Sequence, residues 1–295
     1  MEAVDRGIVT MTEPTKIPKH LLITHDAMKT TFAMRLCGDD ESELRGLGTE
    51  CIAMIDELER KLSRYAEGGD VQRINHLKAG ESLNISEECY ACLREAMEMC
   101  LITGRLFDPT LGAPIEHRKT DAPGDRPEVS GQLMVHPDRA CVSCVTEGRV
   151  IDLGGIGKGF TLDRLAKFLH EWGVVGGLLS SGASTHLAFG DRTWPMDLSG
   201  DHDVKKINLR NAALSASGTS IQGAHIIPPD GWEVDEAAMP KRLWVVSPDG
   251  SAADAWSTAL MLMAPDEMAR CRKSGKRLSA IYVEEGTEII ELAPL

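Results

Sequence analysis

The sequence lacks any run approaching the roughly 20 consecutive apolar residues that a membrane-spanning helix requires. Residues 1–20 contain two prolines and scattered charges but no apolar core, so they predict a flexible segment rather than a secretory signal. The chain has 42% hydrophobic and 26% charged residues, values typical of soluble globular proteins, which excludes disordered and collagen-like chains. We therefore expect one folded domain over residues 21–295, no membrane span and a cytoplasmic location.

An excess of positive charge is also absent. Lys and Arg number 32 against 45 Asp and Glu, which gives a formal net charge of −13. Because such a surface repels phosphate backbones and anionic lipids, we do not expect nucleic acid as a partner. A phosphorylated ligand would require either a local concentration of positive charge or a divalent cation.

The eight cysteines include two C-x-x-C pairs, Cys89 with Cys92 and Cys141 with Cys144. A zinc site is one interpretation, but paired zinc knuckles usually lie roughly 15 to 20 residues apart, and these pairs are much farther apart. The first pair has helical spacing, and the second lies in a β-prone run ahead of the turn at 147–148. We predict buried thiols on a helix and a hairpin, typical of a reducing compartment.

Hydrophobic periodicity predicts one mixed α+β domain, without repeats or linkers. Helices are expected over 50–65, 86–103, 160–172 and 252–263, and a polar loop over 117–126. Strands are expected over 31–36, within 132–153, and over 174–179, 185–189, 194–198 and 206–209. Residues 277–283 and 288–292 are expected to form a closing hairpin around Gly286.

The segment Asp152-Leu-Gly-Gly-Ile-Gly-Lys-Gly159 predicts a strand, a Gly-rich loop and the start of a helix. Glycines let the backbone approach a ligand closely, and the N–H groups of a helix N-terminus favour an anion such as phosphate. Lys158 adds a full positive charge. The glycine spacing matches neither the nucleotide-hydrolase phosphate loop nor the dinucleotide fingerprint, so a phosphate site and an ordinary Gly-rich turn both remain open.

Three further segments carry side chains that could bind a ligand or take part in catalysis. Asp254 and Thr258 lie four apart on a predicted helix, so they share a face and could supply two hard oxygen ligands to Mg²⁺. The alternative is an N-terminal cap by Asp254 and an ordinary helical Thr. His225 could act as a general base or be a surface histidine. Asp108 and Thr110 fit an Asx turn.

Taken in order, these segments resemble the FAD:protein FMN transferases, the ApbE-type flavin transferase family. The resemblance runs from about residue 28 to the end of the chain, and the segment 152–159 followed by Asp163 is its most specific part. The matching segments are Leu62-Ser-Arg-Tyr65 with Val71-Gln-Arg-Ile-Asn75, Phe107-Asp-Pro-Thr-Leu-Gly112, Asp152 to Gly159, Ser217-Gly218, His225-Ile-Ile-Pro228 and Ala253-Asp-Ala-Trp-Ser-Thr-Ala259.

The resemblance implies a single α+β domain of ApbE-like, T-fold-related architecture that binds FAD in a cleft with a divalent metal at the pyrophosphate. It implies Mg²⁺-dependent transfer of FMN to a Thr or Ser hydroxyl of a target protein, with release of AMP. The implied metal contacts are the carbonyl of Gly155 and the side chains of Asp254, Ser257 and Thr258, and the implied catalytic residues are His225 and Asp254. The implied FAD contacts are Met28, Tyr65, Leu106, Phe107, Asp108, Asp152 and Lys158.

The chain departs from the family pattern in three places. Gly69 stands where the family commonly has Ser, and Gly182-Ala-Ser-Thr185 stands where it has Gly-Gly-Asp. The stretch between Ser217-Gly218 and His225 is also short. Two alternatives therefore stay open beside the transferase: an Mg²⁺-dependent pyrophosphatase that converts FAD to FMN and AMP, and a flavin-binding protein without catalysis.

Overall fold

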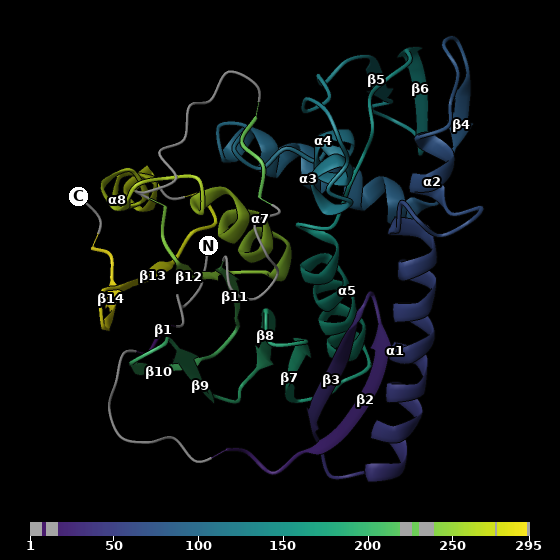
Figure 1. Ribbon diagram of the computed structural model, residues 1–295. Coiled ribbons are helices and arrows are strands. Elements are labelled where there is room, and N and C mark those ends of the chain that lie inside the picture. Colours follow the sequence, from purple (N-terminus) through teal and green to yellow (C-terminus); the bar gives the residue numbers. More distant parts are fainter. Residues whose placement is uncertain (1–7, 10–16, 219–225, 230–238, 275, 294–295) are drawn as a thin grey trace.

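The computed structural model of the chain describes residues 8–9, 17–218, 226–229, 239–274 and 276–293 (Figure 1). Its helices are α1 (Glu41–Leu62), α2 (Asp70–Ile74), α3 (Glu87–Ile102), α4 (Gly112–Lys119), α5 (Gly157–Glu171), α7 (Gly250–Leu260) and α8 (Pro265–Ser274). Its strands are β1 (Ile8–Val9), β2 (Leu21–Ala27), β3 (Thr30–Cys37), β4 (Ser82–Asn84), β5 (Gln132–Val135), β6 (Cys141–Thr146), β7 (Gly176–Ser181), β8 (Thr185–Gly190), β9 (Trp194–Ser199), β10 (Val204–Leu209), β11 (Ala212–Gly218), β12 (Arg242–Ser247), β13 (Ala280–Glu285) and β14 (Glu288–Glu291). Within this described part, no helix is long and apolar enough to cross a membrane.

The largest sheet has the strand order β14-β13-β12-β11-β8-β7-β3-β2, and its neighbouring strands run antiparallel. In β3, Phe32, Met34 and Leu36 are buried and alternate with partly exposed residues, as expected when one face of a strand packs on the core. A shift of one residue would turn these three side chains away from the core, so the hydrophobic pattern fixes the register.

Both faces of the middle of this sheet are buried. Helices α1, α5 and α7 pack on one face, and the small sheet β1-β10-β9 packs on the other (Figure 1). Leu178 and Leu179 of β7 illustrate the division: Leu178 packs with Trp194 of β9, whereas Leu179 packs with residues of α1 and α5. Because successive side chains of a strand point to opposite faces, β7 contributes to both layers.

A third sheet, β4-β6-β5, lies beside α3 and carries the second cysteine pair. Cys89 and Cys92 of α3, and Cys141 and Cys144 of β6, are buried free thiols, as predicted. Burial raises the pKa of the Cys89 and Cys92 thiols, which opposes formation of the thiolate that binds metals. The described residues contain no group of three or more His, Cys, Asp or Glu able to hold a metal, so the zinc interpretation has no support there.

Several predicted boundaries differ from the structure, two of them for a local reason. Helix α1 begins at Glu41 instead of Glu50, because the Asp40 side chain accepts the N–H groups of Ser42 and Glu43 and caps an earlier first turn. The predicted loop over 117–126 contains the end of α4, whose last turn is His117, Arg118 and Lys119. Cations at a helix C-terminus are stabilising, so this polar segment suits a helix end.

The hairpin predictions had mixed outcomes. The closing hairpin is confirmed: β13 pairs with β14 around Gly286, whose φ is +61°. Strands β5 and β6 pair as a hairpin, but the chain reverses between them and not at residues 147–148, which follow β6. The segment before the Gly-rich loop is not a strand; its Val150 forms an isolated bridge with Leu111. The proposed division at residue 20 stays a prediction.

Candidate functional site

The Gly-rich segment forms the turn that starts α5. Asp152 stabilises this turn, since its Oδ1 accepts the N–H of Gly154 at 2.7 Å. Helix α5 begins at Gly157, which places Lys158 in its first turn. The N–H groups of Ile156 and Gly157 already donate to the carbonyl of Leu153, so the attraction of this loop for an anion rests on the partial positive charge of the helix N-terminus and on Lys158.

Helix α7 crosses the start of α5 in direct backbone contact, and we call this place the α5–α7 crossing. A Cβ added to Gly159 would lie 2.0 Å from the carbonyl oxygen of Gly250, and a Cβ on Gly250 would lie 2.5 Å from that of Gly159. Neither position accepts a side chain unless a helix moves. The N–H of Gly159 donates to Oδ2 of Asp254 at 2.7 Å, which joins the Gly-rich loop to the helix predicted to bind metal.

Asp254 is 5% exposed, and its carboxylate accepts two further hydrogen bonds from the sheet. Oδ1 accepts from Oγ1 of Thr185 at 2.6 Å and from Oγ of Ser215 at 2.9 Å. A carboxylate has about four acceptor positions, so one position on Oδ2 remains for a cation. The alternative of a cap for α7 is wrong for Asp254, because Asp249 caps that helix.

Serine hydroxyls extend the oxygen cluster around Asp254. The Oγ atoms of Ser215 and Ser257 are 3.1 Å apart, and Oγ of Ser217 donates to Oγ of Ser257 at 3.0 Å. Ser257 in turn donates to the backbone carbonyl of Asp254 at 3.0 Å. These contacts pack one face of α7 against β11 through oxygen atoms instead of hydrocarbon.

The Gly-rich loop also faces Thr258. A Cβ added to Gly155 would lie 3.3 Å from Oγ1 of Thr258 and 3.2 Å from the ring of Phe107. The structure thus brings together the four predicted metal contacts, Gly155, Asp254, Ser257 and Thr258. Their donors are all oxygen atoms, which Mg²⁺ prefers. With one carboxylate in the set, a cation here would need further oxygen ligands from substrate phosphates or water.

Lys158 points to the same end of the large sheet. Its Nζ donates to Oγ of Ser184 at 2.7 Å, in the turn between β7 and β8. Gly182 opens that turn with a φ of +58°, a conformation that L side chains rarely adopt. The partner of Lys158 is a neutral hydroxyl, so this contact leaves its positive charge uncompensated.

Two further predicted residues, Tyr65 and Asp152, meet in a group that we call the Arg64 cluster: Arg64, Tyr65, Glu116, Lys119 and Asp152. Nη1 of Arg64 is 3.1 Å from Asp152 and Nη2 is 3.3 Å from Glu116, while Nζ of Lys119 is 3.8 Å from Asp152. The Tyr65 hydroxyl donates to Glu116 at 2.6 Å. Burial and then this hydrogen bond raise the pKa of Tyr65 to about 12, so the phenol stays protonated near neutral pH.

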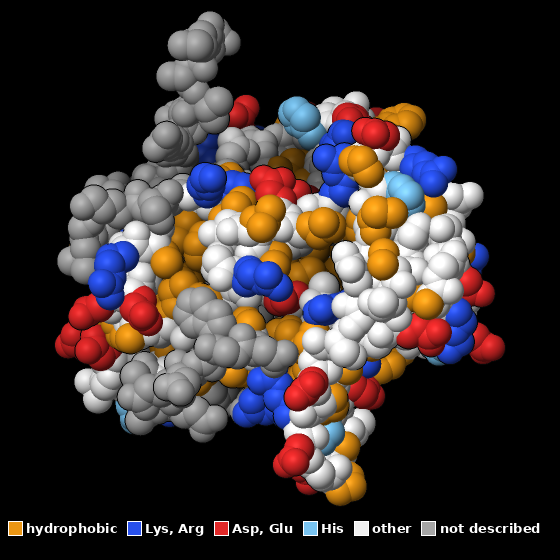
Figure 2. Space-filling view, turned by 90° about the horizontal axis from the view of Figure 1, so that it is seen from above, with side chains coloured by type: hydrophobic (Ala, Val, Ile, Leu, Met, Phe, Trp, Pro, Cys, Tyr) orange, Lys and Arg blue, Asp and Glu red, His pale blue; other side chains and the backbone are white. Residues whose placement is uncertain are grey.

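The Arg64 cluster does not by itself supply the local positive charge that a phosphorylated ligand requires, because its two cations, Arg64 and Lys119, are balanced by two carboxylates. Nζ of Lys29 lies 5.0 Å from the ring centre of Tyr65, and the guanidinium of Arg64 lies 5.2 Å from it. In the view from above, Lys and Arg side chains lie near the middle of a face that also exposes many hydrophobic side chains (Figure 2).

The remaining predicted FAD contacts lie close to these two places. Met28 is in the turn between β2 and β3; its N–H donates to Glu59 at 2.7 Å, and its sulfur accepts from Oγ1 of Thr161 of α5 at 3.8 Å. Its φ is +50°, which is uncommon for a residue with a side chain.

The segment Leu106-Phe107-Asp108 is largely structural in its contacts. Leu106 and Phe107 are 2% and 3% exposed and belong to the core, with Phe107 beside the Gly-rich loop. Asp108 accepts both the N–H and the hydroxyl of Thr110, at 2.8 and 2.7 Å, which confirms the predicted Asx turn.

His225 lies outside the described residues. The segment that follows it, residues 226–229, contacts the region of α4: Arg118 donates to the carbonyl of Ile226 at 3.3 Å, and Arg126 donates to that of Pro228 at 2.8 Å. Ile227 is buried.

Several residues of the site were not predicted from the sequence, namely Arg64, Ser184, Thr185 and Ser215. Ser215 was detectable in part, because it alternates with Ser217 and strand periodicity places both on one face. Arg64 lies inside a matching motif, but its partners come from distant segments. Thr185 and Ser184 carry no local signal for their contacts with Asp254 and Lys158.

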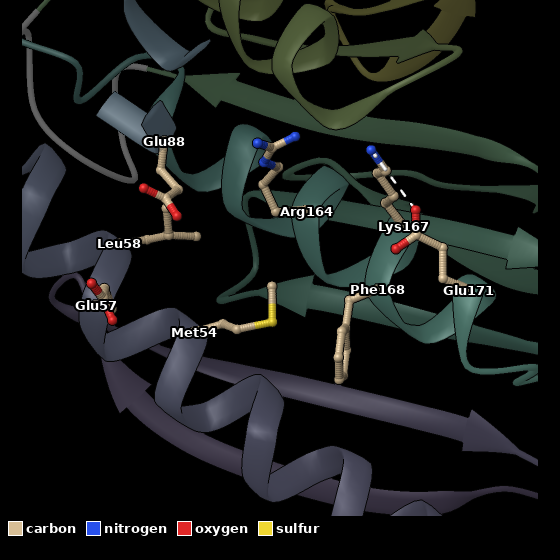
Figure 3. A pocket seen from close by; sticks show the side chains of 8 residues that line it. All are labelled: Met54, Glu57, Leu58, Glu88, Arg164, Lys167, Phe168 and Glu171. Atoms are coloured by element: carbon tan, nitrogen blue, oxygen red, sulfur yellow. Dashed lines mark ion pairs between the residues drawn. The ribbon is translucent and has the colours of Figure 1, made fainter. Parts of the chain in front are cut away.

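A hollow of about 300 Å³ lies between α1, α3 and α5, away from these groups (Figure 3). Met54 and Leu58 of α1 and Phe168 of α5 form its apolar part, and Arg164 and Glu88 lie at its polar side. It is lined by none of the predicted site residues. The Gly-rich loop and α7 therefore remain the candidate site.

Comparison with known proteins gives a consistent result. A model described as the ApbE family matches residues 28–282. An FAD:protein FMN transferase of Klebsiella pneumoniae (strain 342) is 21% identical, with 90% of each chain covered. One of Chlamydia muridarum (strain MoPn / Nigg) is 24% identical, covering 79% of this chain and 80% of the relative.

Solved structures share the fold. The flavin transferase ApbE from Vibrio cholerae superposes with a TM-score of 0.75 at 18% identity, covering 92% of this chain and 96% of the other. The ApbE protein from Thermotoga maritima gives a TM-score of 0.76 at 21% identity, covering 92% and 97%. Because the sequence identities are only 18% and 21%, these structural matches establish the mixed α and β fold alone.

Proposed function

Because the chain belongs to the ApbE family, we propose that it transfers FMN from FAD to a Thr or Ser hydroxyl of a target protein and releases AMP. The proposal includes dependence on Mg²⁺, a flavin transferase domain over residues 21–295 and a cytoplasmic location. The observation that carries it is the convergence of the Gly-rich loop, Lys158 and the oxygen cluster of Asp254 where α5 and α7 cross.

The donor set fits a hard divalent cation that shares its ligands with a phosphorylated substrate. In the proposal, the carbonyl of Gly155 and the side chains of Asp254 and Thr258 hold Mg²⁺, with Ser257 as a further contact. Bound Mg²⁺ would neutralise charge on the pyrophosphate. Lys158 and the N-terminus of α5 add positive charge toward the same anion.

The transfer forms one bond and breaks one. The oxygen of the acceptor hydroxyl bonds to the phosphorus of the FMN moiety, and the bond from that phosphorus to the bridging oxygen breaks, so AMP leaves with the electron pair. The acceptor proton must go to a base. We assign this role to His225, which directly precedes Ile226; the histidine's ordinary pKa permits it.

FAD would extend from the α5–α7 crossing toward the Arg64 cluster. The proposed contacts are Met28, Tyr65, Leu106, Phe107, Asp108, Asp152 and Lys158. Support comes from position: Met28 contacts Thr161 of α5, Phe107 borders the Gly-rich loop, and Asp152 joins that loop to the Arg64 cluster. Exposed Tyr65 offers an aromatic surface beside two cations.

Incubation with FAD and Mg²⁺, with and without a Thr-containing acceptor protein, tests the proposal. AMP is followed by chromatography, and the acceptor's mass by mass spectrometry. The expected result is acceptor carrying FMN, with an equal amount of AMP. AMP and free FMN without acceptor would indicate the pyrophosphatase, and Mg²⁺-independent FAD binding without turnover of any acceptor would indicate a flavin-binding protein.

Asp254→Asn should lower FMN transfer at least about a hundredfold, because a bound cation contributes several kcal/mol to the transition state. Asp197→Asn is the matched control: it also removes one carboxylate, but from an exposed position on β9, and should leave transfer unchanged. Full activity of Asp254→Asn would refute the metal assignment.

A further inference from the structure

The two helices at the α5–α7 crossing cap each other. Asp254 of α7 accepts the N–H of Gly159, in the first turn of α5. In return, Asp163 of α5 accepts the N–H of Gly250 at 2.6 Å and that of Ser251 at 2.8 Å, the first two residues of α7. Each helix therefore supplies a carboxylate to the other's unpaired N–H groups.

Asp163 makes a third contact, since Oγ of Ser251 donates to it at 2.6 Å. Both carboxylate oxygens are thus engaged with one turn of α7. Two hydrogen bonds from consecutive backbone N–H groups fix the rotation of the helix as well as its distance. A rotation of α7 by one residue, 100°, would turn Asp254 away from the Gly-rich loop.

At the point of closest approach, Gly159 and Gly250 meet without side chains, so no side chain interlocks the two helices there. At that point, the reciprocal hydrogen bonds fix the first turn of α7 on α5. Asp254 lies one turn beyond the residues that Asp163 holds, and Ser257 and Thr258 lie one turn further on the same helix. A displacement of the first turn of α7 would therefore also move Asp254, Ser257 and Thr258.

The surroundings of Asp163 disfavour the ionised form of its carboxyl group. It is partly buried and faces Asp249 and Ser251 of α7. Burial and then the charge of Asp249 raise the pKa of Asp163 to about 7. Asp249 has a different function, because it caps its own helix through Ala252 and pairs with Arg277.

We propose that Asp163 is a positioning residue that holds α7 at the distance and rotation required for Asp254 and Thr258 to share a cation with the Gly-rich loop. It acts through the backbone of Gly250 and Ser251 and does not touch substrate. The inference rests on the proposed function, since it concerns the same cation.

The test determines two Mg²⁺ concentrations. The first gives half of the maximal increase in FAD affinity, measured by quenching of flavin fluorescence. The second gives half of the maximal rate of FMN transfer. Asp163→Asn should raise both about 10- to 100-fold, as is typical when a residue that orients metal ligands is lost. Transfer at saturating Mg²⁺ should recover most of its rate, which a merely destabilised fold would not predict.

Asp249→Asn is the matched control, since it removes one carboxylate from the same helix end and leaves the three hydrogen bonds of Asp163 in place. It should shift either concentration less than threefold. An Mg²⁺ dependence of Asp163→Asn equal to that of the unchanged protein, or an equal shift in both variants, would overturn the inference.

If circular dichroism shows Asp163→Asn to be unfolded, Ser251→Ala takes its place, because it removes one of the three bonds and keeps both backbone bonds. It should raise the half-maximal Mg²⁺ concentration by roughly two- to fivefold, the effect of one ordinary hydrogen bond. An unchanged Mg²⁺ concentration would overturn the inference. A native protein that binds no FAD with or without Mg²⁺ refutes the proposed function itself.

Discussion

The α5–α7 crossing and the Arg64 cluster are built in opposite ways, although both contain predicted site residues. At the crossing, backbone meets backbone, the Asp254 carboxylate accepts three hydrogen bonds, and the side chain is 5% exposed. In the Arg64 cluster, long side chains form ion pairs at 3.1 to 3.8 Å, and Tyr65 is 52% exposed.

The difference indicates which part is preformed and which can adapt. Groups fixed by short buried hydrogen bonds and glycine contacts cannot rearrange without moving a helix. In the Arg64 cluster, the pair of Arg64 with Asp152 is buried, with side chains 12% and 7% exposed. Glu116, Lys119 and Tyr65 are partly exposed, so a ligand can replace their contacts at small cost. We therefore expect the crossing to set the reactive geometry and the Arg64 cluster to adjust to the bound flavin.

The sharpest way to break the crossing is Gly159→Ala. The added Cβ would lie 2.0 Å from a backbone oxygen of Gly250, so α7 must move. We expect a loss of about 3 kcal/mol in the free energy of unfolding, the upper end of overpacking costs, measured by urea denaturation. Transfer activity should fall as well, because the Gly159 N–H would no longer reach Asp254.

Gly157→Ala is the control on the same helix, two residues away. No atom lies within 4 Å of a Cβ at that position, so alanine should be neutral or stabilise by up to about 1 kcal/mol. Equal destabilisation by the two variants would show that helix α5 tolerates no side chain at its start, and that contact with Gly250 is not the cause.

A smaller effect is expected from Arg64→Met. The Asp152 side chain is 7% exposed and would keep Lys119, at 3.8 Å, as its cation. We expect the free energy of unfolding to fall by about 1–3 kcal/mol, because a buried carboxylate loses one hydrogen-bond donor. FAD affinity should weaken, as measured by fluorescence quenching, while the rate at saturating FAD should change little. A lower rate with unchanged affinity would contradict an adaptable role for the cluster.

Arg60→Met provides the comparison for that experiment. Arg60 is 58% exposed and pairs with Glu57 at 3.6 Å on the surface of α1. Exposed pairs of this kind contribute little, so the free energy of unfolding should change by less than about 0.5 kcal/mol. FAD affinity should remain unchanged in this variant.

The stability of the folded protein should also depend on pH through Asp163 at the crossing. The pKa of Asp163 is about 7 in the folded chain against 3.8 as its ordinary value, so between these values the folded state keeps a proton that the unfolded state has lost. The stability that this group contributes is complete below pH 3.8 and is lost as the pH rises through about 7. The slope is at most about 1.4 kcal/mol per pH unit.

Urea denaturation from pH 4 to 8 measures this dependence, and Asp163→Asn should flatten it. Charged groups around Asp163 also contribute: Asp249 of α7, Arg164 of its own helix, Glu95 of α3 and Arg277 before β13. The comparison between the variant and the unchanged protein separates Asp163 from these neighbours. Identical slopes would show that Asp163 keeps its ordinary pKa in the folded protein.

Local chemistry made several features predictable from the sequence. The spacing of Asp254 and Thr258 placed both on one face of a helix, Ser86 correctly marked the start of α3, and the Asp108 turn followed from its own side chain. Strands β11 and β12 were not predicted, because short buried strands lack the alternation that marks a half-exposed one.

The sequence alone determined the candidate ligands, because their chemistry and spacing are local: a Gly-rich loop with a lysine, and a carboxylate four residues before a hydroxyl. Only the tertiary structure decided what surrounds them. Sheet order brings Thr185 and Ser215 to Asp254, and the crossing of α5 and α7 brings Gly159 against Gly250. Such contacts join distant segments, so they depend on how helices and sheets pack, which no local pattern contains.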